Sequence, residues 1–489
     1  MSERSVAEHS VLMDLDEAAA GPARSKRPVD KTFRKYDQDQ PMLLAPDIRD
    51  WVGSGHPARW VNDLVEDGLD LGPIYDDYTE VRGGPPYDPR LMVKVLIYGY
   101  SHGITSSRAL ERRCHDDVAF GFLTAQQAPD FVAISRFRTR HGEAFKELFT
   151  QSLALCAQAG LVSLGRVALD GSKIRASASR HRAMSYDRMV RAEGELAAEV
   201  EALLADAENL DAAEDAAYGA DRRGDELPAE LTRREGRLAA IRVAKVALEA
   251  EHRAKARAAA EQAATQGGQD PEQATAAGDV AKAAAVVPAK AQRSFTDPDA
   301  RIMKTSDGSF HYCYNAQHLV DEHSQVILGW ELRPSGADCP ALPDMLTRLT
   351  TSLAAAGIAG LPKTLLADAG YFSADNVTAV TEAGMDPLLA TGRLKHGEKP
   401  PPAPRGRIPN DLTPKQRMTR KLQTLKGKAD YARRKAIVEP VFGQMKVAQD
   451  AERFRLRGTE KTDGEWALHT FCHNLRKLQG SGWTPQIAI

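Results

Sequence analysis

Residues 181–293 form a segment that a β-sheet cannot contain. They consist mainly of Ala, Glu, Arg and Gln, with almost no aromatic side chains, whereas strands are enriched in β-branched and aromatic residues. Strong helix formers with apolar residues at helical spacing predict a helical hairpin over about 185–265, broken near 224–228. Residues 265–290 are of low complexity, and we expect them to be loose. Any sheet in this chain must therefore combine segments from both sides of the interruption.

Short apolar runs on both sides of the insertion predict that sheet. Before it, Arg166–Asp170 has the sequence RVALD, which is typical of a buried strand that ends on an aspartate. The first two runs after the insertion suit an antiparallel pair joined by a polar turn, and the last two flank a helical stretch as in a βαβ unit. These four runs lie at residues 312–320, 325–332, 364–367 and 387–390, and the helical stretch at 373–383. The pattern predicts a mixed α/β core.

The residues before the first strand have a helical pattern. Asp88 followed by Pro89 predicts an N-cap and a first helical residue, opening a helix that is apolar on nearly all sides and ends near residue 99 or 103. Serines 106 and 107 can cap a helix over 108–114. Ser135 can cap another that runs from Arg136 past residue 148 and carries Arg136 and Arg140 on one face.

These boundaries divide the chain into four parts. We expect an all-α N-terminal domain and a mixed-sheet domain that is interrupted by a helical insertion, with a flexible polar arm at the start of the chain. The parts are the arm (1–40), the helical domain (41–160), the mixed-sheet domain (161–180 and 294–485) and the insertion (181–293).

Charge is distributed unevenly along the chain, although the formal net charge is only -2. Residues 186–230 hold 14 Asp and Glu against 4 Lys and Arg, whereas residues 393–457 hold 18 Lys and Arg against 6 Asp and Glu. Local charge rather than net charge governs the binding of polyanions. The basic segment is therefore a candidate surface for nucleic-acid phosphates, with a solvated loop as the alternative.

The composition argues against several classes of protein. We find no apolar run long enough to span a membrane and no secretory signal in residues 1–31, so we expect a cytoplasmic protein. The five cysteines are scattered without a CxxC pair, so we expect reduced core thiols and no zinc site. The signatures GxxxxGK[ST], GxSxG and HExxH are missing from the sequence, which argues against an ATPase, a serine hydrolase and a zincin.

Two aspartates directly follow apolar runs. Asp170 precedes Gly171, and Asp368 lies in the sequence LLADAGYFSADN. Open α/β sheets bind ligands at strand ends, so the two carboxylates would meet in one cleft if their strands were neighbours. Either aspartate could instead be an ordinary turn or N-cap residue.

Other aspartates near strands have simpler interpretations. Asp297 and Asp299 flank Pro298 and are interpreted as turn residues, and Asp321 also lies near a strand. Asp338, in SGADCP, is interpreted as the N-cap of the next helix.

The third candidate acid is Glu439, within YARRKAIVEPVFGQMK. As a helix, this segment would place Tyr431, Arg434 or Lys435, Glu439 and Lys446 on roughly one side. A glutamate among lysines is usually a surface ion pair. Here the dense basic run favours a carboxylate that holds a metal beside cations facing a polyanion. Three carboxylates supply hard oxygen ligands, for which Mg²⁺ is best suited.

The combined motifs resemble the DDE transposases of bacterial insertion sequences. The matching features are LDGS around Asp170, ADAGY around Asp368 and the helical segment from Tyr431 to Lys446, together with YDPRLMVKVLIYGYSHGITSSRALERRC, PDFVAISRFRTRH, DPDARIMK, YNAQHLVD and RFRLRGTEKTDGEWALHTFCHNLRKL. The resemblance covers about residues 42–180 and 295–480. One departure is that four residues rather than three separate Arg434 from Glu439, which leaves Lys435 at the usual arginine position.

The resemblance implies an RNase H-like catalytic core in which Asp170, Asp368 and Glu439 bind two Mg²⁺ ions, with Mn²⁺ as a substitute. It also implies that Tyr431, Arg434 or Lys435, and Lys446 contact DNA. The N-terminal domain, with Arg136 and Arg140, would help to recognise the transposon ends.

The function that follows from the resemblance is metal-dependent cleavage and strand transfer on double-stranded DNA, by a homodimer that joins two ends. The first alternative is a DNA-binding repressor or architectural protein that has lost catalysis. The second is an oligomerisation scaffold built on the Ala-rich helices, against which the lack of sustained heptad positions argues.

Overall fold

The computed structural model describes residues 47–79, 85–178, 183–218, 229–392, 402–406, 409 and 411–485. The expected arm (1–40) and the expected break at 224–228 lie outside these residues. From Ile48 onward the described chain belongs to one compact unit.

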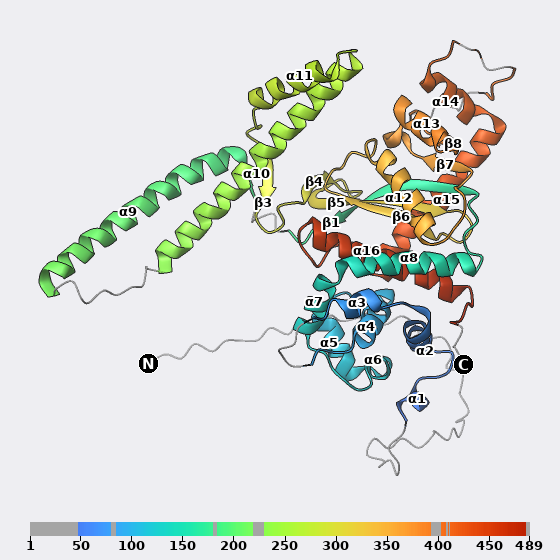
Figure 1. Cartoon of the computed structure of the whole chain (residues 1–489), viewed down its shortest axis with the longest axis horizontal. Helices are drawn as coiled ribbons and strands as arrows, with labels where there is room; N and C mark the ends of the chain where they lie inside the picture. The colour runs from blue at the N-terminus through green and yellow to red at the C-terminus, as the bar shows by residue number, and fades with distance from the viewer. Residues whose placement is uncertain are drawn as a thin grey trace, which may run out of the picture. The chain divides into compact units, whose positions relative to one another are not determined.

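A six-stranded mixed sheet forms the centre of the C-terminal half (Figure 1). Its strand order is β4-β5-β1-β7-β8, and β6 pairs with β5 on the same side as β4. The strands are β1 (Arg166–Arg175), β4 (Arg301–Lys304), β5 (Phe310–Asp321), β6 (Ile327–Arg333), β7 (Thr364–Ala367) and β8 (Asp386–Leu389). The antiparallel β5–β6 pair and the parallel β7–α13–β8 unit, with α13 at Ala374–Glu382, confirm the sequence-based predictions.

The strand β1 is longer than the sequence predicted. It does not end at Asp170 but continues to Arg175, because β5 pairs with it in antiparallel register from Val167–Asp321 to Arg175–Cys313. The parallel partner β7 ends earlier, at Ala367. Asp170 therefore lies within β1, at the position where its pairing with β7 stops.

Helices cover both faces of the sheet. The face that carries His318 is covered by α15 (Leu425–Ala448) and α16 (Thr459–Gly480). Phe442 of α15 stacks its ring on the His318 ring, with 4.6 Å between the ring centres. Trp466 of α16 donates its indole N–H to His318 Nε2 at 3.1 Å. The opposite face is covered by α12 (Ala341–Ala355), whose Leu349 lies close to Gly329 of β6. Further along the chain, α14 (Pro414–Gln423) precedes α15.

The N-terminal part is helical, as predicted. Asp88 caps the buried helix α4 by accepting from the backbone N–H of Arg90, with Pro89 as the first helical residue. The elements are α1 (Ile48–Trp51), α2 (Pro57–Asp63), the π-helical turn η1 (Leu64–Gly68), α3 (Gly72–Asp76), α4 (Pro89–Ser101), α5 (Ser107–Asp116), α6 (Val118–Leu123), α7 (Phe131–Arg140) and α8 (Gly142–Gln158).

The helix predicted to start at Arg136 is in fact two helices. Asp130, rather than Ser135, caps α7, and the chain turns at His141 before α8 begins at Gly142. Arg136 and Arg140 both lie on α7 and are exposed, so the prediction that they share a face is confirmed.

The insertion forms helices that leave and rejoin the core through a small ribbon. Strands β2 (Ala183–Ser185) and β3 (Gln292–Ser294) pair in antiparallel fashion at its base. The two long helices α9 (Tyr186–Tyr218) and α10 (Ala229–Gln266) confirm the predicted hairpin. The expectation of a loose tail was wrong, because Asp270 caps the helix α11 (Pro271–Ala284), which packs on α10.

The cysteines agree with the expectation of reduced core thiols. All five cysteines are free, and four of them are buried, with burial raising the pKa of each of these four thiols. In the described part of the chain, no helix has the length and apolar character needed to cross a membrane.

Gly464 allows α16 to cross α8 at close range. A Cβ atom at this position would stand 2.6 Å from the Cα of Gly142, which is backbone and cannot move aside easily. We expect Gly464→Ala to lower the free energy of unfolding by about 1–3 kcal/mol. Gly480→Ala on the same helix meets nothing within 4 Å and should change it by less than about 1 kcal/mol. Urea denaturation of both variants measures the difference, and equal stabilities would contradict this packing.

Three histidines, His318, His469 and His473, are buried in the core and hold no charge there. Burial lowers the pKa of His318 well below 6.5, and it lowers the pKa of both His469 and His473 to about 3. Below pH 6.5 the unfolded chain therefore takes up protons that the folded chain excludes. The free energy of unfolding consequently decreases as the pH is lowered.

We expect each of these histidines to lower the free energy of unfolding by about 1 kcal/mol when the pH falls from 6.5 to 5.5. His473→Gln should remove about one histidine's share of this loss, because glutamine can still bond to the carbonyl of Gln325 but does not titrate. Free energies of unfolding at the two pH values, compared between this variant and the unaltered chain, check the expectation. An unchanged pH dependence in the variant would show that His473 does not contribute.

Candidate active site

The sheet brings Asp170 and Asp368 together. Leu169 of β1 pairs with Ala367, the last residue of β7, in parallel register. Asp170, the next residue of β1, therefore lies beside Asp368, which directly follows β7, and neighbouring strands lie about 4.8 Å apart. Asp368 also caps a 3-10 turn, η3 (Ala369–Tyr371), by accepting from Gly370 N–H at 2.8 Å. The condition under which the two carboxylates would meet, that β1 and β7 are neighbouring strands, is therefore fulfilled.

Asp170 is partly buried and pairs with a cation. Its Oδ2 accepts from Arg434 Nη1 at 2.7 Å. Burial raises the pKa of Asp170, Arg434 opposes that rise, and the neighbouring Asp368 adds to it. The buried guanidinium of Arg434 thus compensates two carboxylates that would otherwise repel each other.

Gly171, which follows Asp170, packs closely against β5. A Cβ atom here would stand 2.4 Å from Gln317 Nε2 and 2.9 Å from Asn315 Oδ1. The space beside the glycine is therefore filled by side chains of β5, and is not open for a ligand to approach the backbone.

The helix α15 delivers the cationic side of the site. Thr424 caps it by accepting from Gly427 N–H at 3.0 Å, and Val438, Val441 and Met445 bury its apolar side. Lys446, two turns beyond Glu439, donates to Ser172 Oγ at 2.7 Å, and burial lowers the pKa of Lys446. Arg434 and Lys446 therefore contact β1 two residues apart, at Asp170 and Ser172.

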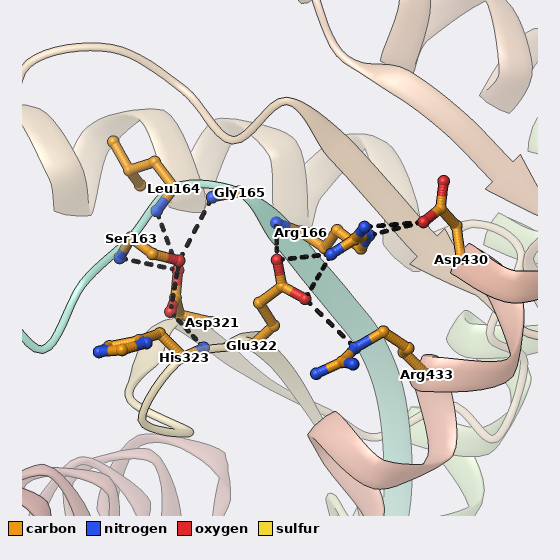
Figure 2. Close-up of polar contacts among 9 residues, drawn as sticks. All are labelled: Ser163, Leu164, Gly165, Arg166, Asp321, Glu322, His323, Asp430 and Arg433. Carbon is orange, nitrogen blue, oxygen red and sulfur yellow. Dashed lines mark hydrogen bonds and ion pairs between the residues drawn. The ribbon is translucent and has the colours of Figure 1, made fainter. Parts of the chain in front are cut away.

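Ion pairs fix the N-terminal half of α15 against the sheet (Figure 2). Arg166, the first residue of β1, pairs with Asp430 and with Glu322, both at 2.8 Å, and Glu322 also pairs with Arg433 at 3.5 Å. Asp430 and Arg433 bracket Tyr431 in the chain, and Arg433 directly precedes Arg434. Because these contacts set the rotation of the helix, they keep Arg434 directed at Asp170.

A second anchor lies beside Glu439. Pro440 has no N–H, so the carbonyl of Ala436 has no partner within the helix. Gln325, at the β5–β6 turn, donates its side-chain N–H to that carbonyl at 3.1 Å. Its own backbone carbonyl bonds to His473 Nε2 at 2.9 Å, which links α15 to α16 through one residue.

Glu439 is more exposed than the two aspartates. Its side chain is 54% exposed, and Glu439 Oε1 lies 3.9 Å from Arg434 Nη2. In the described ranges, no three His, Cys, Asp or Glu side chains lie close enough to hold one metal ion together. The structure thus places Asp170 and Asp368 side by side and connects Glu439 to Asp170 through Arg434, without closing the three acids around a single point.

The other predicted residues differ in their surroundings. Tyr431 is half-buried near Arg434, whereas Lys435 is exposed, so the buried cation at the acids is Arg434. On α7, Arg136 is exposed and Arg140 pairs with Asp77 at 2.7 Å.

Sequence reasoning missed a network of polar side chains near Asp368. Tyr371 is buried and donates its hydroxyl hydrogen to Gln317 Oε1, and Gln317 Nε2 donates to Asp338 Oδ1 at 3.0 Å. The interpretation of Asp338 as a helix N-cap was wrong, because Pro340 is the N-cap of α12 and Asp338 instead accepts from residues of β1 and β5. An Asn and a Gln two residues apart in the apolar strand β5 were the signal that could have revealed this network.

The interpretation of Asp297 and Asp299 as turn residues also missed tertiary contacts. Asp297 is buried and accepts from the hydroxyl of Tyr314 at 2.8 Å, and Asp299 accepts from Thr459 N–H at the start of α16 at 2.9 Å. Both stabilise the junction with α16.

Comparison with protein families bears directly on this site. The model described as Transposase DDE domain matches residues 287–475, and the one described as Transposase domain (DUF772) matches residues 46–140. The chain belongs to the DDE transposases. No curated protein and no solved structure matches it. The DDE match starts at residue 287, near the end of the insertion. It therefore includes Asp368 and Glu439 but not Asp170, whose position beside Asp368 comes from strand pairing. Its mixed α/β architecture is consistent with the RNase H-like core of that domain.

The ion pairs of Glu322 should hold α15 in place. Glu322→Gln removes the charge shared by Arg166 and Arg433, and we expect the free energy of unfolding to fall by about 1–2 kcal/mol. Hydrogen exchange of residues 425–436 should speed up relative to α16. Glu382→Gln, an exposed residue at the end of α13, serves as the control. Unchanged exchange in α15 would mean that the helix is held by its apolar contacts alone.

Proposed function

We propose that this transposase cleaves the ends of its DNA element and transfers them to target DNA through a site formed by Asp170, Asp368 and Glu439. The observation that carries the proposal is the pairing of β1 with β7, which sets two carboxylates side by side where a basic helix passes over them. The phosphodiester is negatively charged, so a site with cations next to acids suits it.

The donor atoms of these residues are of the kind that divalent cations prefer. Asp170, Asp368 and Glu439 offer hard oxygen donors, for which Mg²⁺ is suited, with Mn²⁺ as a substitute. Two such ions would supply activation of the attacking oxygen and stabilisation of the leaving oxygen. Asp170 is partly buried and contacts a guanidinium, which supports a site where bound cations would offset the charge of the carboxylates.

The cations of α14 and α15 are proposed to contact DNA. Arg434 and Lys446 are proposed to orient phosphates at the acids, with Tyr431 beside them, and Lys435 to contact the backbone outside the site. Exposed lysines continue along the same two helices, at Lys415, Lys426 and Lys428. On α7, Arg136 has support from its exposure, whereas the ion pair of Arg140 with Asp77 must open for it to contact DNA.

Domain roles follow from the same proposal. The helical residues 41–160 are proposed to recognise the ends, and residues 161–180 and 294–485 to carry the chemistry. The segment 181–293 is a separate insertion, and 1–40 an arm. A homodimer is proposed because two ends must be joined.

The test uses the full-length protein, a supercoiled plasmid carrying the element's ends, and Mg²⁺. We expect Asp170→Asn, Asp368→Asn and Glu439→Gln each to reduce cleavage by about a hundredfold or more, because each removes a carboxylate charge from the site. Asp375→Asn, an exposed position in the first turn of α13, should cleave like the unaltered protein.

The outcomes separate the alternatives. Full cleavage by all three variants would refute the site. Binding to the ends without cleavage by the unaltered protein, under either Mg²⁺ or Mn²⁺, would favour a DNA-binding protein that has lost catalysis.

A further inference from the structure

We propose that an arginine-lined groove beside the acids binds the phosphate backbone of one strand of the element's end. The groove is formed by α5, the C-terminal end of β1 and residues 450–457, which lie between α15 and α16. This inference rests on the proposed function, because it gives the DNA a path away from the same site. A strand of the end is the occupant because the groove joins the acids to the helical residues that are proposed to recognise that end.

One edge of β1 is open between the acids and this groove. On the edge opposite β5, the strand β7 pairs with β1 only up to the residue before the first acid. Further along that edge, Arg175 donates its backbone N–H to the carbonyl of Glu452 at 3.0 Å and accepts from Phe454 N–H at 2.9 Å. In the described part of the chain, no strand pairs with residues 170–174 on this edge. The acids therefore lie at one end of the gap and the groove at the other.

The gap has the length of a short piece of DNA. Arg175 lies five residues after Asp170 in β1, which is a separation of about 16 Å in an extended strand. One strand of duplex DNA advances about 3.4 Å per nucleotide, so about five nucleotides cover this distance. Within the gap, Lys446 of α15 contacts Ser172 at 2.7 Å. A cation therefore lies between the acids and the groove.

Arginines alternate with apolar residues at the centre of the groove. Residues 450–457 have the sequence DAERFRLR. The side chains of Arg453, Arg455 and Arg457 are exposed, whereas the two residues between them are buried or half-buried. The segment thus packs on the core through its apolar side chains and presents its guanidinium groups to solvent.

The backbone of this segment is fixed by Glu465 of α16. Its carboxylate is 1% exposed and accepts from the backbone N–H groups of Arg455 and Leu456, at 3.0 Å and 2.8 Å. The side chain of Arg455 is fixed as well, because it donates to Thr105 Oγ1 at 3.1 Å and pairs with Asp450. Groups that are held in place before binding lose less entropy on binding. The segment is therefore preorganised.

The groove consists of two adjoining cavities, of about 460 Å³ beside α5 and about 370 Å³ beside the end of β1. They adjoin because Arg455 and Asp450 line both. Five arginines and three acids line the two cavities, and the arginines are Arg112, Arg113, Arg175, Arg453 and Arg455. Among the described lining residues there is no exposed Phe, Tyr or Trp side chain on which a base could stack. The lining therefore suits phosphates better than bases.

Two of these arginines are available to a ligand. Arg113 pairs with Asp117 and Arg175 pairs with Asp307, each at 3.5 Å. By contrast, none of the described residues forms an ion pair or a hydrogen bond with the guanidinium of Arg112 or Arg453. Guanidinium groups bind phosphate oxygens through charge-assisted hydrogen bonds, so these two are the first candidates for contact with the strand.

The experiment measures binding of the full-length protein to a fluorescent duplex of the element's end, without divalent ions and at several salt concentrations. We expect Arg112→Gln and Arg453→Gln each to weaken binding about three- to tenfold and to reduce the slope of log Kd against log salt by about one, because each removes one phosphate contact. The control is Arg348→Gln, at an exposed residue of α12, and it should change neither quantity. Equal thermal unfolding temperatures for the four proteins would show that the fold is retained.

A second measurement locates the contact on the DNA. A single uncharged methylphosphonate linkage is moved along one strand of the duplex. It should weaken binding of the unaltered protein when it lies about five nucleotides from the cleaved phosphate. Arg453→Gln should be insensitive to the linkage at that position alone, because the contact is already lost. The same interference pattern in both proteins would contradict the assignment of Arg453.

The outcomes separate this inference from the proposed function. If both arginine variants bind the end normally while the unaltered protein cleaves it, the groove does not carry the strand and the proposed function stands. If the variants bind and cleave the ends normally but lose strand transfer, the groove holds target DNA and this inference is wrong. If the unaltered protein does not bind the end duplex, the proposed function fails together with this inference.

Discussion

The parallel pairing of β1 with β7 is the constraint on which the site depends. It places Asp170 beside Asp368 and so creates a local excess of negative charge in a partly buried position. Such a pair is costly unless a cation compensates it. The chain provides Arg434 for this purpose and fixes its helix by ion pairs to the first residue of β1. The sheet and α15 are therefore parts of one electrostatic unit.

The insertion does not disturb this unit because it enters and leaves through one ribbon. β2 and β3 pair with each other, so the chain returns close to the point where it left β1. The helices α9 and α10 have a small apolar cluster of their own, around Met189, Leu196, Leu238 and Ile241. Helical residues could thus be accommodated between β1 and β4 without interrupting the register of β1 and β5.

Local signals in the sequence were sufficient for some elements and insufficient for others. The cap at Asp88 and the βαβ unit at 364–390 depend on neighbouring residues, and both were predictable. The full length of β1 was not, because only its pairing with β5 continues beyond Asp170. Asp338 was misassigned for a similar reason. Its SGADCP context resembles a helix start, and its partners Lys173 and Asn315 come from distant strands.

The proline after Glu439 has a mechanical consequence. A proline in a helix normally leaves a carbonyl unbonded and allows a bend, but here Gln325 bonds to that carbonyl from outside. With Arg166 holding the helix before Glu439 and Gln325 holding it at the proline, the backbone around the glutamate has little freedom to shift. In the proposed site, Glu439 then approaches the two aspartates by rotation about its own side-chain bonds. That is a rapid, low-barrier motion compared with the displacement of a helix.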